Sequence, residues 1–242
     1  DSPSWTSAVI RIHTLSPVAA NETRCRRASP TSTIGPLAWQ HTQRSREIMR
    51  VIAVGCEYSG VTSLLNGLRD WGSERGFHFH LDDHFSIPDR YHLSPEDQKI
   101  MSDLPPVLKE RFQRMQLVYH IRVANRHEHC LLGGFHIEEG IYGPLYYYPG
   151  TASEDKRQYE VEMPADAILV HLTARAEVIR SRMQSDQHDF NLIREADIDD
   201  LLERFKAEYT ASWLSHKIEI DTSELTPPEL LDTYFERVKP HL

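Results

Sequence analysis

A short apolar run that ends in glycine and passes into a helical pattern constrains the fold of this chain more than any other feature. Residues 51–68 read VIAVGCEYSGVTSLLNGL. The β-branched run before Gly55 is typical of a buried central strand, and leucines recur at helical spacing after Gly60. The sequence therefore predicts a strand, a tight glycine loop and a helix in direct succession.

The loop inside this stretch, GCEYSGVTS, has a spacing of glycines that suits phosphate. It fits the pattern G-x-x-x-x-G-K-[ST] at every defined position except Val61, which stands where the pattern has lysine. Glycines let the backbone turn sharply, so that consecutive N–H groups point at phosphate oxygens at a helix N-terminus. Thr62 has a hydroxyl at the position that contacts Mg²⁺. The residues expected to cradle phosphate are Gly55, Cys56, Glu57, Tyr58, Ser59, Gly60, Val61, Thr62 and Ser63.

Val61 limits this interpretation. Lysine at that position adds a cation beside the β- and γ-phosphates, and valine cannot. Backbone binding of phosphate can survive the loss, whereas catalysis then depends on another source of positive charge. The alternative is a strand-to-helix turn whose glycines serve the fold alone.

Strand-like and helix-like segments alternate along the rest of the chain, which is the pattern of a parallel sheet flanked by helices. Strands are expected at 50–55, at 77–83, from 129 to near His136, at 167–174 and at 217–223. Helices are expected at 61–76, at 94–126 with a break at Pro105 and Pro106, at 175–183, at 195–214 and at 227–239. The predicted fold class is α/β, with a mostly parallel central sheet between two layers of helices.

The composition changes near Met49. Residues 1–48 hold six arginines, no lysine and three acids, a net charge of +3 that leaves −12 for residues 49–242 out of the total of −9. An arginine-rich, serine-rich leader resembles an organelle transit peptide, but it can equally be translated upstream sequence before a start at Met49, which we favour. We expect residues 1–48 to be a disordered leader and residues 49–242 to be the folded domain.

Composition also excludes several classes of protein. The three cysteines lack any CxxC spacing, which argues against disulfides and structural zinc and favours the cytoplasm, with organelle import open if the leader is genuine. No apolar run approaches the roughly 18 residues of a membrane span. The net charge of −9 offers no general attraction for nucleic acid. We therefore expect a soluble protein without nucleic-acid or membrane partners.

An acidic pair ends the second expected strand, in the segment HLDDHFSIP. Asp82 and Asp83 stand at a carboxyl end of a strand, and in open α/β sheets ligands bind at that edge. One carboxylate there can accept a hydroxyl proton, and the other can hold a water on magnesium. The alternative is a solvated acidic turn.

The pairing of GCEYSGVTS with LDDHFSIP resembles the P-loop nucleoside kinases of the uridine kinase and nicotinamide riboside kinase type. The segments ILVHLTARAEVIRSRM and READIDDLLERFKAEYTAS are similar to the lid region of thymidylate and nucleoside kinases. The resemblance covers most of residues 50–225 and implies a three-layer P-loop NTPase-like fold. It also implies ATP, Mg²⁺ and a small nucleoside- or nucleotide-like acceptor, with Asp82 or Asp83 as the base.

Arginines are the expected replacement for the missing lysine, because a guanidinium binds phosphate oxygens bidentately. By the same resemblance, Arg180 and Arg182 would occupy the lid positions that reach phosphates. They lie two residues apart on a helix, so at most one is expected to face the site. Arg175 and Arg194 are further candidates, and each of the four can instead be a solvated charge paired with an acid.

Glu138 and Glu139 follow the third expected strand, in GGFHIEEGIYGPLYYY, and either can bring a carboxylate to magnesium. The tyrosines behind them can stack on a base or cover the core. Two rival functions remain: a sulfotransferase, whose loop ends S-G-T-T without the lysine, and a nucleotide-binding module without catalysis. A homodimer is left open.

Overall fold

The computed structural model describes residues 48–83, 94–151, 155–185 and 192–241. They belong to one folded unit, residues 44–242. The expected leader lies outside the described ranges except for Ile48. None of the helices in these ranges combines the length and the apolar content that a membrane span requires.

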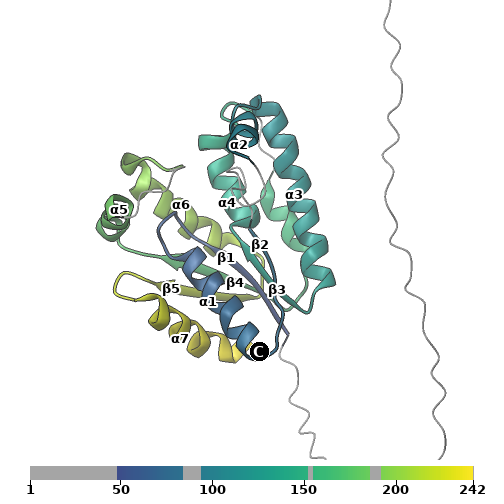
Figure 1. Cartoon of the computed structure of the whole chain (residues 1–242), viewed down its shortest axis with the longest axis vertical. Helices are drawn as coiled ribbons and strands as arrows, with labels where there is room; N and C mark the ends of the chain where they lie inside the picture. The colour runs from purple at the N-terminus through teal and green to yellow at the C-terminus, as the bar shows by residue number, and fades with distance from the viewer. Residues whose placement is uncertain (1–47, 84–93, 152–154, 186–191, 242) are drawn as a thin grey trace, which may run out of the picture. The chain divides into compact units, whose positions relative to one another are not determined.

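The centre of the fold is a sheet of five strands, all parallel, in the order β2-β3-β1-β4-β5 (Figure 1). The strands are β1 (Met49–Val54), β2 (His80–Asp83), β3 (His129–Gly133), β4 (Ala167–Thr173) and β5 (His216–Asp221). β1 is central, and its Ile52 lies in register with Leu132 on one side and Leu169 on the other. Because all strands are parallel, the loops that follow them gather at one edge of the sheet.

Helices connect the strands, as parallel pairing requires. They are α1 (Val61–Glu74), α2 (Pro95–Ser102), α3 (Pro106–Arg126), α4 (Phe135–Tyr142), α5 (Ala176–Ser185), α6 (Ile198–Ala211) and α7 (Pro227–Val238), with shorter turns η1 (Gly143–Tyr147), η2 (Lys156–Glu162), η3 (Glu195–Asp197) and η4 (Lys239–His241). The Ser94 side chain caps α2 by accepting from the Asp97 N–H at 3.2 Å. The predicted break at Pro105 is confirmed, since α2 ends before it and α3 begins after it.

Two apolar cores lie on the two faces of the sheet. Alternate residues of a strand point to opposite faces, so Ile52 and Val54 enter one core while Val51 and Ala53 enter the other. The first core is completed by α3, α4 and α6, and the second by α1 and α7 (Figure 1). The predicted α/β fold with three layers and a parallel sheet is confirmed.

One prediction about the sheet is wrong. The third strand was expected to end near His136 and run into a loop, but β3 ends at Gly133 and α4 begins at Phe135. Gly134 (φ 72°) and Phe135 (φ 49°) are both left-handed, which turns the chain out of the strand and directly into a helix. Glu138 and Glu139 consequently stand on a helix, about 100° apart around its axis.

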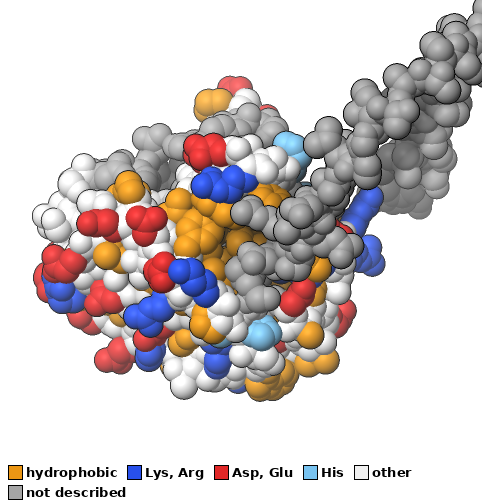
Figure 2. All heavy atoms as spheres, turned by 90° about the horizontal axis from the view of Figure 1, so that it is seen from below, with side chains coloured by type: hydrophobic (Ala, Val, Ile, Leu, Met, Phe, Trp, Pro, Cys, Tyr) orange, Lys and Arg blue, Asp and Glu red, His pale blue; other side chains and the backbone are white. Residues whose placement is uncertain are grey.

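The charges of the folded unit are mixed on the face that Figure 2 shows. Acidic and basic side chains are interspersed there, and neither sign forms a broad patch. Many of the described ion pairs are short-range and exposed, such as Lys99 with Asp103 and Arg204 with Asp200. Such exposed pairs contribute little to stability, about 0–1 kcal/mol each.

Candidate functional site

The loop between β1 and α1 has the conformation of an anion-binding turn. Tyr58 (φ 67°) and Gly60 (φ 103°) are left-handed, and Gly60 is the N-cap of α1 without a side-chain cap. The Ser59 N–H donates to the Cys56 carbonyl oxygen at 2.9 Å and closes the turn between them. Alternating backbone conformations of this kind make a concave set of N–H groups, and the first N–H groups of a helix have no intrahelical partner. The loop can therefore hold phosphate at the N-terminus of α1.

Gly55 is required by the close approach of β4. A Cβ atom there would lie 2.3 Å from the Leu172 carbonyl oxygen and 2.4 Å from Ser59 Oγ. Neither atom can move far, because one is strand backbone and the other is completely buried. Only glycine fits at this position without moving the loop.

The outer side of the loop is held by Arg182 of α5 and by Thr222, which follows β5. Arg182 Nη1 donates to the Tyr58 carbonyl oxygen at 2.9 Å, and its Nη2 donates to the Thr222 carbonyl oxygen at 2.6 Å. The Thr222 hydroxyl donates to the Ser59 carbonyl oxygen at 2.8 Å. Since a trans peptide directs its C=O and N–H oppositely, the Gly60 N–H points away from Thr222. These contacts hold the Tyr58 and Ser59 carbonyl oxygens on the side of Arg182 and Thr222 and leave the Gly60 N–H on the opposite side.

Tyr142 of α4 holds the beginning of the loop from another side. Its buried hydroxyl accepts from the Glu57 N–H at 3.0 Å, while the Glu57 carboxylate accepts from the Ile193 N–H at 3.2 Å. Burial raises the pKa of Tyr142 well above its usual value, so this hydroxyl is neutral at physiological pH. Burial also raises the pKa of the Cys56 thiol to about 12, against a hydrogen bond to Tyr142 that lowers it. Cys56 is therefore a neutral core residue and not a nucleophile.

The acidic pair stands two strands away from the loop. Asp82 is in register with Leu132 and Asp83 with Gly133, which is in turn in register with Ala53 of β1. Two inter-strand spacings separate the ends of β2 and β1, about 10 Å. β3 and the start of α4 lie between the two strand ends. His84 of the same motif lies outside the described residues.

Of the two adjacent glutamates on α4, the structure brings only one to the loop. The half-buried carboxylate of Glu138 lies over Gly134, where a Cβ atom would be 2.4 Å from its Oε2. The Gly134 N–H donates to the carbonyl oxygen of Ala53, two residues before Gly55, at 2.8 Å. Glu139 is completely buried on another side of α4, where it accepts from the Tyr148 hydroxyl. Glu138 is thus placed to take part in a metal site at the loop, and Glu139 faces the interior of the fold.

The expected arginines have protein partners. Arg180 and Arg182 diverge, as their spacing predicted: Arg180 forms an ion pair with Asp199 of α6, and Arg182 binds the loop backbone. The remaining candidates also bond to acids, and these pairs are Arg175 with Glu177 and Glu224, and Arg194 with Asp197. Only Arg182 lies against the loop, where it contacts carbonyl oxygens on the side away from the Gly60 N–H.

Residues near the start of α1 are open to a ligand. Thr62 and Ser63 are exposed, so a hydroxyl is available where the loop pattern calls for a Mg²⁺ contact. Val61 instead packs against the core shared by α1 and α7. Within the described ranges, no three His, Cys, Asp or Glu side chains converge as they would around a metal ion. The ring of His80 stacks on that of His127 at 4.3 Å.

Sequence reasoning missed Thr222 and the roles of Tyr142 and Glu57. Their partners lie 40 to 163 positions away along the chain, so no local period reveals them. The only sequence signal for Thr222 is its place: a hydroxyl residue directly after a strand of the parallel sheet stands at the edge where ligand loops meet.

No protein-family model matches this sequence, and no curated protein matches it either. Solved structures do match. The YorR protein of Bacillus subtilis, determined in complex with phosphorylated GDP, is 15% identical, with 79% of this chain and 98% of that chain covered and a TM-score of 0.52. Thymidylate kinase from Candida albicans is 14% identical, with 80% and 94% covered and a TM-score of 0.54.

This chain shares the α/β fold of these two proteins. The likeness covers about four fifths of this chain and nearly the whole of each of the two proteins. The loop expected to bind phosphate, residues 55–63, spans the turn between β1 and α1 and the first residues of α1, with Val61 as the first residue of α1. At 14–15% identity the likeness concerns the fold, and the chemistry has to be argued from the residues of this chain.

Proposed function

We propose that this protein binds ATP with Mg²⁺ at the P-loop and transfers a phosphoryl group to a small nucleoside- or nucleotide-like acceptor. One observation supports the proposal: two left-handed residues, with the Arg182 and Thr222 contacts to the Tyr58 and Ser59 carbonyl oxygens, hold the loop in a tight turn at the N-terminus of α1, where the first helical N–H groups have no intrahelical partner. A loop with no ligand function needs neither the unfavourable conformation of Tyr58 nor so many contacts to maintain it.

The donor set also fits the two cofactors. A Cβ atom at Gly55 would fill the space taken by the loop and β4, so the loop keeps its shape only with glycine. Thr62 offers an exposed hydroxyl, and Glu138 has a half-buried carboxylate over Gly134, whose N–H bonds to β1 just before the loop. Both are oxygen ligands of the kind that Mg²⁺ prefers. When bound, magnesium would neutralise charge that develops on the phosphates.

Asp82 or Asp83 would accept the proton of the acceptor hydroxyl. Both are the last residues of β2, at the carboxyl-end edge of the sheet where the loop after β1 also lies. A carboxylate acts as a general base when it lies within hydrogen-bond reach of the hydroxyl. Since the transfer depends mainly on positioning and electrostatics, Val61 is expected to slow it without abolishing it.

A second function is favoured by Val61 itself. The valine is packed on the core of α1 and α7, and Arg182, a cation that contacts the loop, is bonded to backbone carbonyls. A protein that retained the cradle without a cation at the β- and γ-phosphates would bind nucleotide without turnover. This non-catalytic module shares the proposed binding of ATP and lacks the proposed phosphoryl transfer.

Calorimetric titration of the full chain tests the shared half. The ligands are ATP with and without Mg²⁺, and adenosine 3′,5′-bisphosphate, which a sulfotransferase would prefer. We expect ATP to bind in a magnesium-dependent manner, and Thr62→Val to reduce that dependence. Preference for the bisphosphate would favour the sulfotransferase. Binding of neither ligand would indicate that the loop is a strand-to-helix turn that serves the fold alone.

Release of ADP in the presence of nucleosides and nucleoside monophosphates tests catalysis. The Asp82→Asn, Asp83→Asn double variant should lose turnover and keep ATP binding, while Asp70→Asn, an exposed carboxylate on α1, serves as the control. Full activity of the double variant on every acceptor would remove these aspartates from the mechanism. Binding of ATP without any turnover would support the non-catalytic module.

A further inference from the structure

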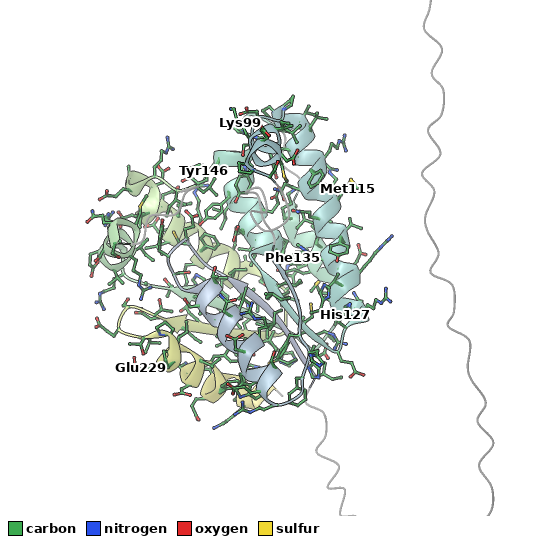
Figure 3. All side chains as sticks on the ribbon, viewed as in Figure 1. Lys99, Met115, His127, Phe135, Tyr146 and Glu229 are labelled. Atoms are coloured by element: carbon green, nitrogen blue, oxygen red, sulfur yellow. The ribbon has the colours of Figure 1, made fainter. Side chains whose placement is uncertain are left out.

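α3 has a second apolar face, which is exposed. One face of this helix is buried against the sheet and α4, with Leu117, Ile121 and Ala124 among its residues. The large apolar side chains that are exposed on the same helix are Val107, Leu108, Phe112, Met115, Val118 and Tyr119. Met115 is 72% exposed, and Figure 3 places it on the outer side of α3. A surface helix normally has a single apolar stripe, so a second one indicates an interaction site.

The exposed residues follow a regular spacing. Leu108, Phe112, Met115 and Tyr119, which we call the outer face of α3, succeed one another at intervals of four, three and four residues. Apolar residues at this alternation form the seam of a coiled coil, in which side chains of one helix pack into holes on another. At 100° per residue the outer face points almost directly away from Leu117 and Ala124. The face is therefore built to receive a helix.

We propose that the outer face of α3 is the interface of a symmetric homodimer, in which the α3 helices of two copies pack antiparallel. A two-fold axis between Gln113 and Arg114 sets Leu108 opposite the partner's Tyr119 and Phe112 opposite the partner's Met115. Every residue of the outer face then meets an apolar residue of the second copy. Self-complementarity of this kind is what a two-fold interface requires.

The charges on α3 suit the same register. Its exposed charges are basic, so a poorly placed second copy would be repelled. In the proposed register, however, Arg111 comes level with the partner's Gln116, and Lys109 with the partner's Val118. Arg122 comes level with the turn before the partner's α3, where Asp103, paired with Lys99 in its own chain, is exposed. No two cations of the seam face each other, and one new ion pair becomes available.

The area is also of the right size. The six exposed side chains present on the order of 600 Å² of mainly apolar surface, at the upper end of what a monomer leaves uncovered. A standard interface buries about 800 Å² on each partner. The arginines that flank the apolar side chains would supply the remaining area. This assembly does not depend on the proposed kinase activity.

Sedimentation of the full chain over a range of concentrations tests the proposal. We expect a mass twice that of the 28.0 kDa chain. Met115→Glu should raise the dissociation constant of the dimer at least about 100-fold, because it buries a charge at the centre of the seam. Val161→Glu is the matched control, since Val161 is 75% exposed on η2, outside the face, and that variant should stay dimeric.

A charge pairing tests the register. Phe112→Lys alone should also give monomers, whereas Phe112→Lys combined with Met115→Glu should regain dimers, since each lysine would face the partner's glutamate. A wild-type chain that stays at 28.0 kDa up to about 100 μM would overturn the proposal. A Met115→Glu variant that associates as tightly as wild type would do so too, and a double variant no tighter than the single ones would overturn the antiparallel pairing.

Discussion

Arg182 Nη1 donates to the carbonyl oxygen of Tyr58 at 2.9 Å, across 124 positions of the chain. The contact joins α5 to the one non-glycine residue of the P-loop that is left-handed. Such a conformation costs about 1–3 kcal/mol and persists only where surrounding contacts maintain it. Arg182 therefore acts on the loop by positioning its backbone, from the side away from the ligand.

Replacing Arg182 with methionine should loosen the P-loop. The variant loses the bonds to Tyr58 and Thr222, and we expect it to be less stable by about 1–3 kcal/mol and to bind ATP about tenfold more weakly. Urea unfolding followed by circular dichroism and calorimetry measures the two effects. Arg180→Met is the control, because Arg180 lies two residues away on the same helix and forms an ion pair with the exposed Asp199.

Arg182→Lys separates charge from geometry. Lysine retains the positive charge but has no planar fork, so it cannot hold both carbonyl oxygens. If positioning is the role of Arg182, the lysine variant should resemble Arg182→Met. Wild-type ATP affinity in the lysine variant would instead indicate that the charge itself attracts the phosphates.

Introducing the absent lysine should strengthen phosphate binding. In Val61→Lys the ammonium would reach the β- and γ-phosphates from the first turn of α1, and a charge-assisted hydrogen bond contributes about 1.5–3 kcal/mol. We expect ATP affinity, and turnover if the protein is a kinase, to rise about 10- to 100-fold. Calorimetry and ADP release measure them.

Val61→Met is the control for packing, since it retains an apolar side chain against the core of α1 and α7. Its ATP affinity should match that of wild type. Unchanged affinity in the lysine variant would mean that the loop does not present its ligand to position 61 in the way P-loops do.

A buried pair far from the loop should contribute to stability. His136 Nε2 lies 2.6 Å from Glu160 Oε1, and Glu160 Oε2 accepts from the Trp213 N–H at 2.5 Å. Burial tends to raise the pKa of Glu160, but the His136 and Trp213 bonds outweigh it and lower the pKa below its ordinary value. The carboxylate thus adds stability above about pH 4.5 that is lost as the pH falls through its lowered pKa.

Glu160→Gln should cost about 1–3 kcal/mol at pH 7, because an amide cannot accept from both donors. Urea unfolding measures the loss. Glu162→Gln, two residues along the chain and exposed, should leave stability unchanged. Equal stability of the two variants would show that the buried carboxylate contributes nothing net.

The sequence predicted those parts of the fold whose signals are local. β1, α1, β4 and the break at Pro105 follow from period, glycine and proline within a few residues, and each is confirmed. The start of α4 was not predictable in this way, because its apolar residues suit a strand as well as a helix. What decides is the left-handed pair Gly134 and Phe135, and phenylalanine gives no sign of adopting that conformation.

In the candidate site, too, the sequence predicted the features with local signals and not those that depend on long-range packing. The glycines of the loop could be recognised because the turn itself requires them. Arg182 was recognised as a residue of interest, but its contacts with Tyr58 and Thr222 depend on how α5 and β5 pack beside the loop. Glu138 and Glu139 point in different directions because they stand on α4. The sequence predicted a loop there, so it could not distinguish the two residues.

The final prediction concerns alkaline pH. Burial raises the pKa of Cys56, Tyr142 and Tyr234 above their ordinary values of 9.0 and 10.0, to about 12 for Cys56. Below pH 9 these groups are protonated in both the folded and the unfolded chain, so they do not affect stability. Between pH 9 and 12 the unfolded chain loses these protons first, and each group then lowers the free energy of unfolding by up to about 1.4 kcal/mol per pH unit.

Urea unfolding at intervals from pH 7 to pH 11 measures this decline. Cys56→Ser isolates one group, because serine does not titrate in this range. Above pH 9 the free energy of unfolding of this variant should fall less steeply with pH than that of wild type, by the slope that corresponds to up to one proton. Cys130→Ser controls for the cost of burying a serine hydroxyl, here on β3. It is a weaker control because it also removes a buried thiol. If the Cys56→Ser variant declines as steeply as wild type, the Cys56 thiol ionises as readily in the folded P-loop as in the unfolded chain, and the buried environment assigned to it here is wrong.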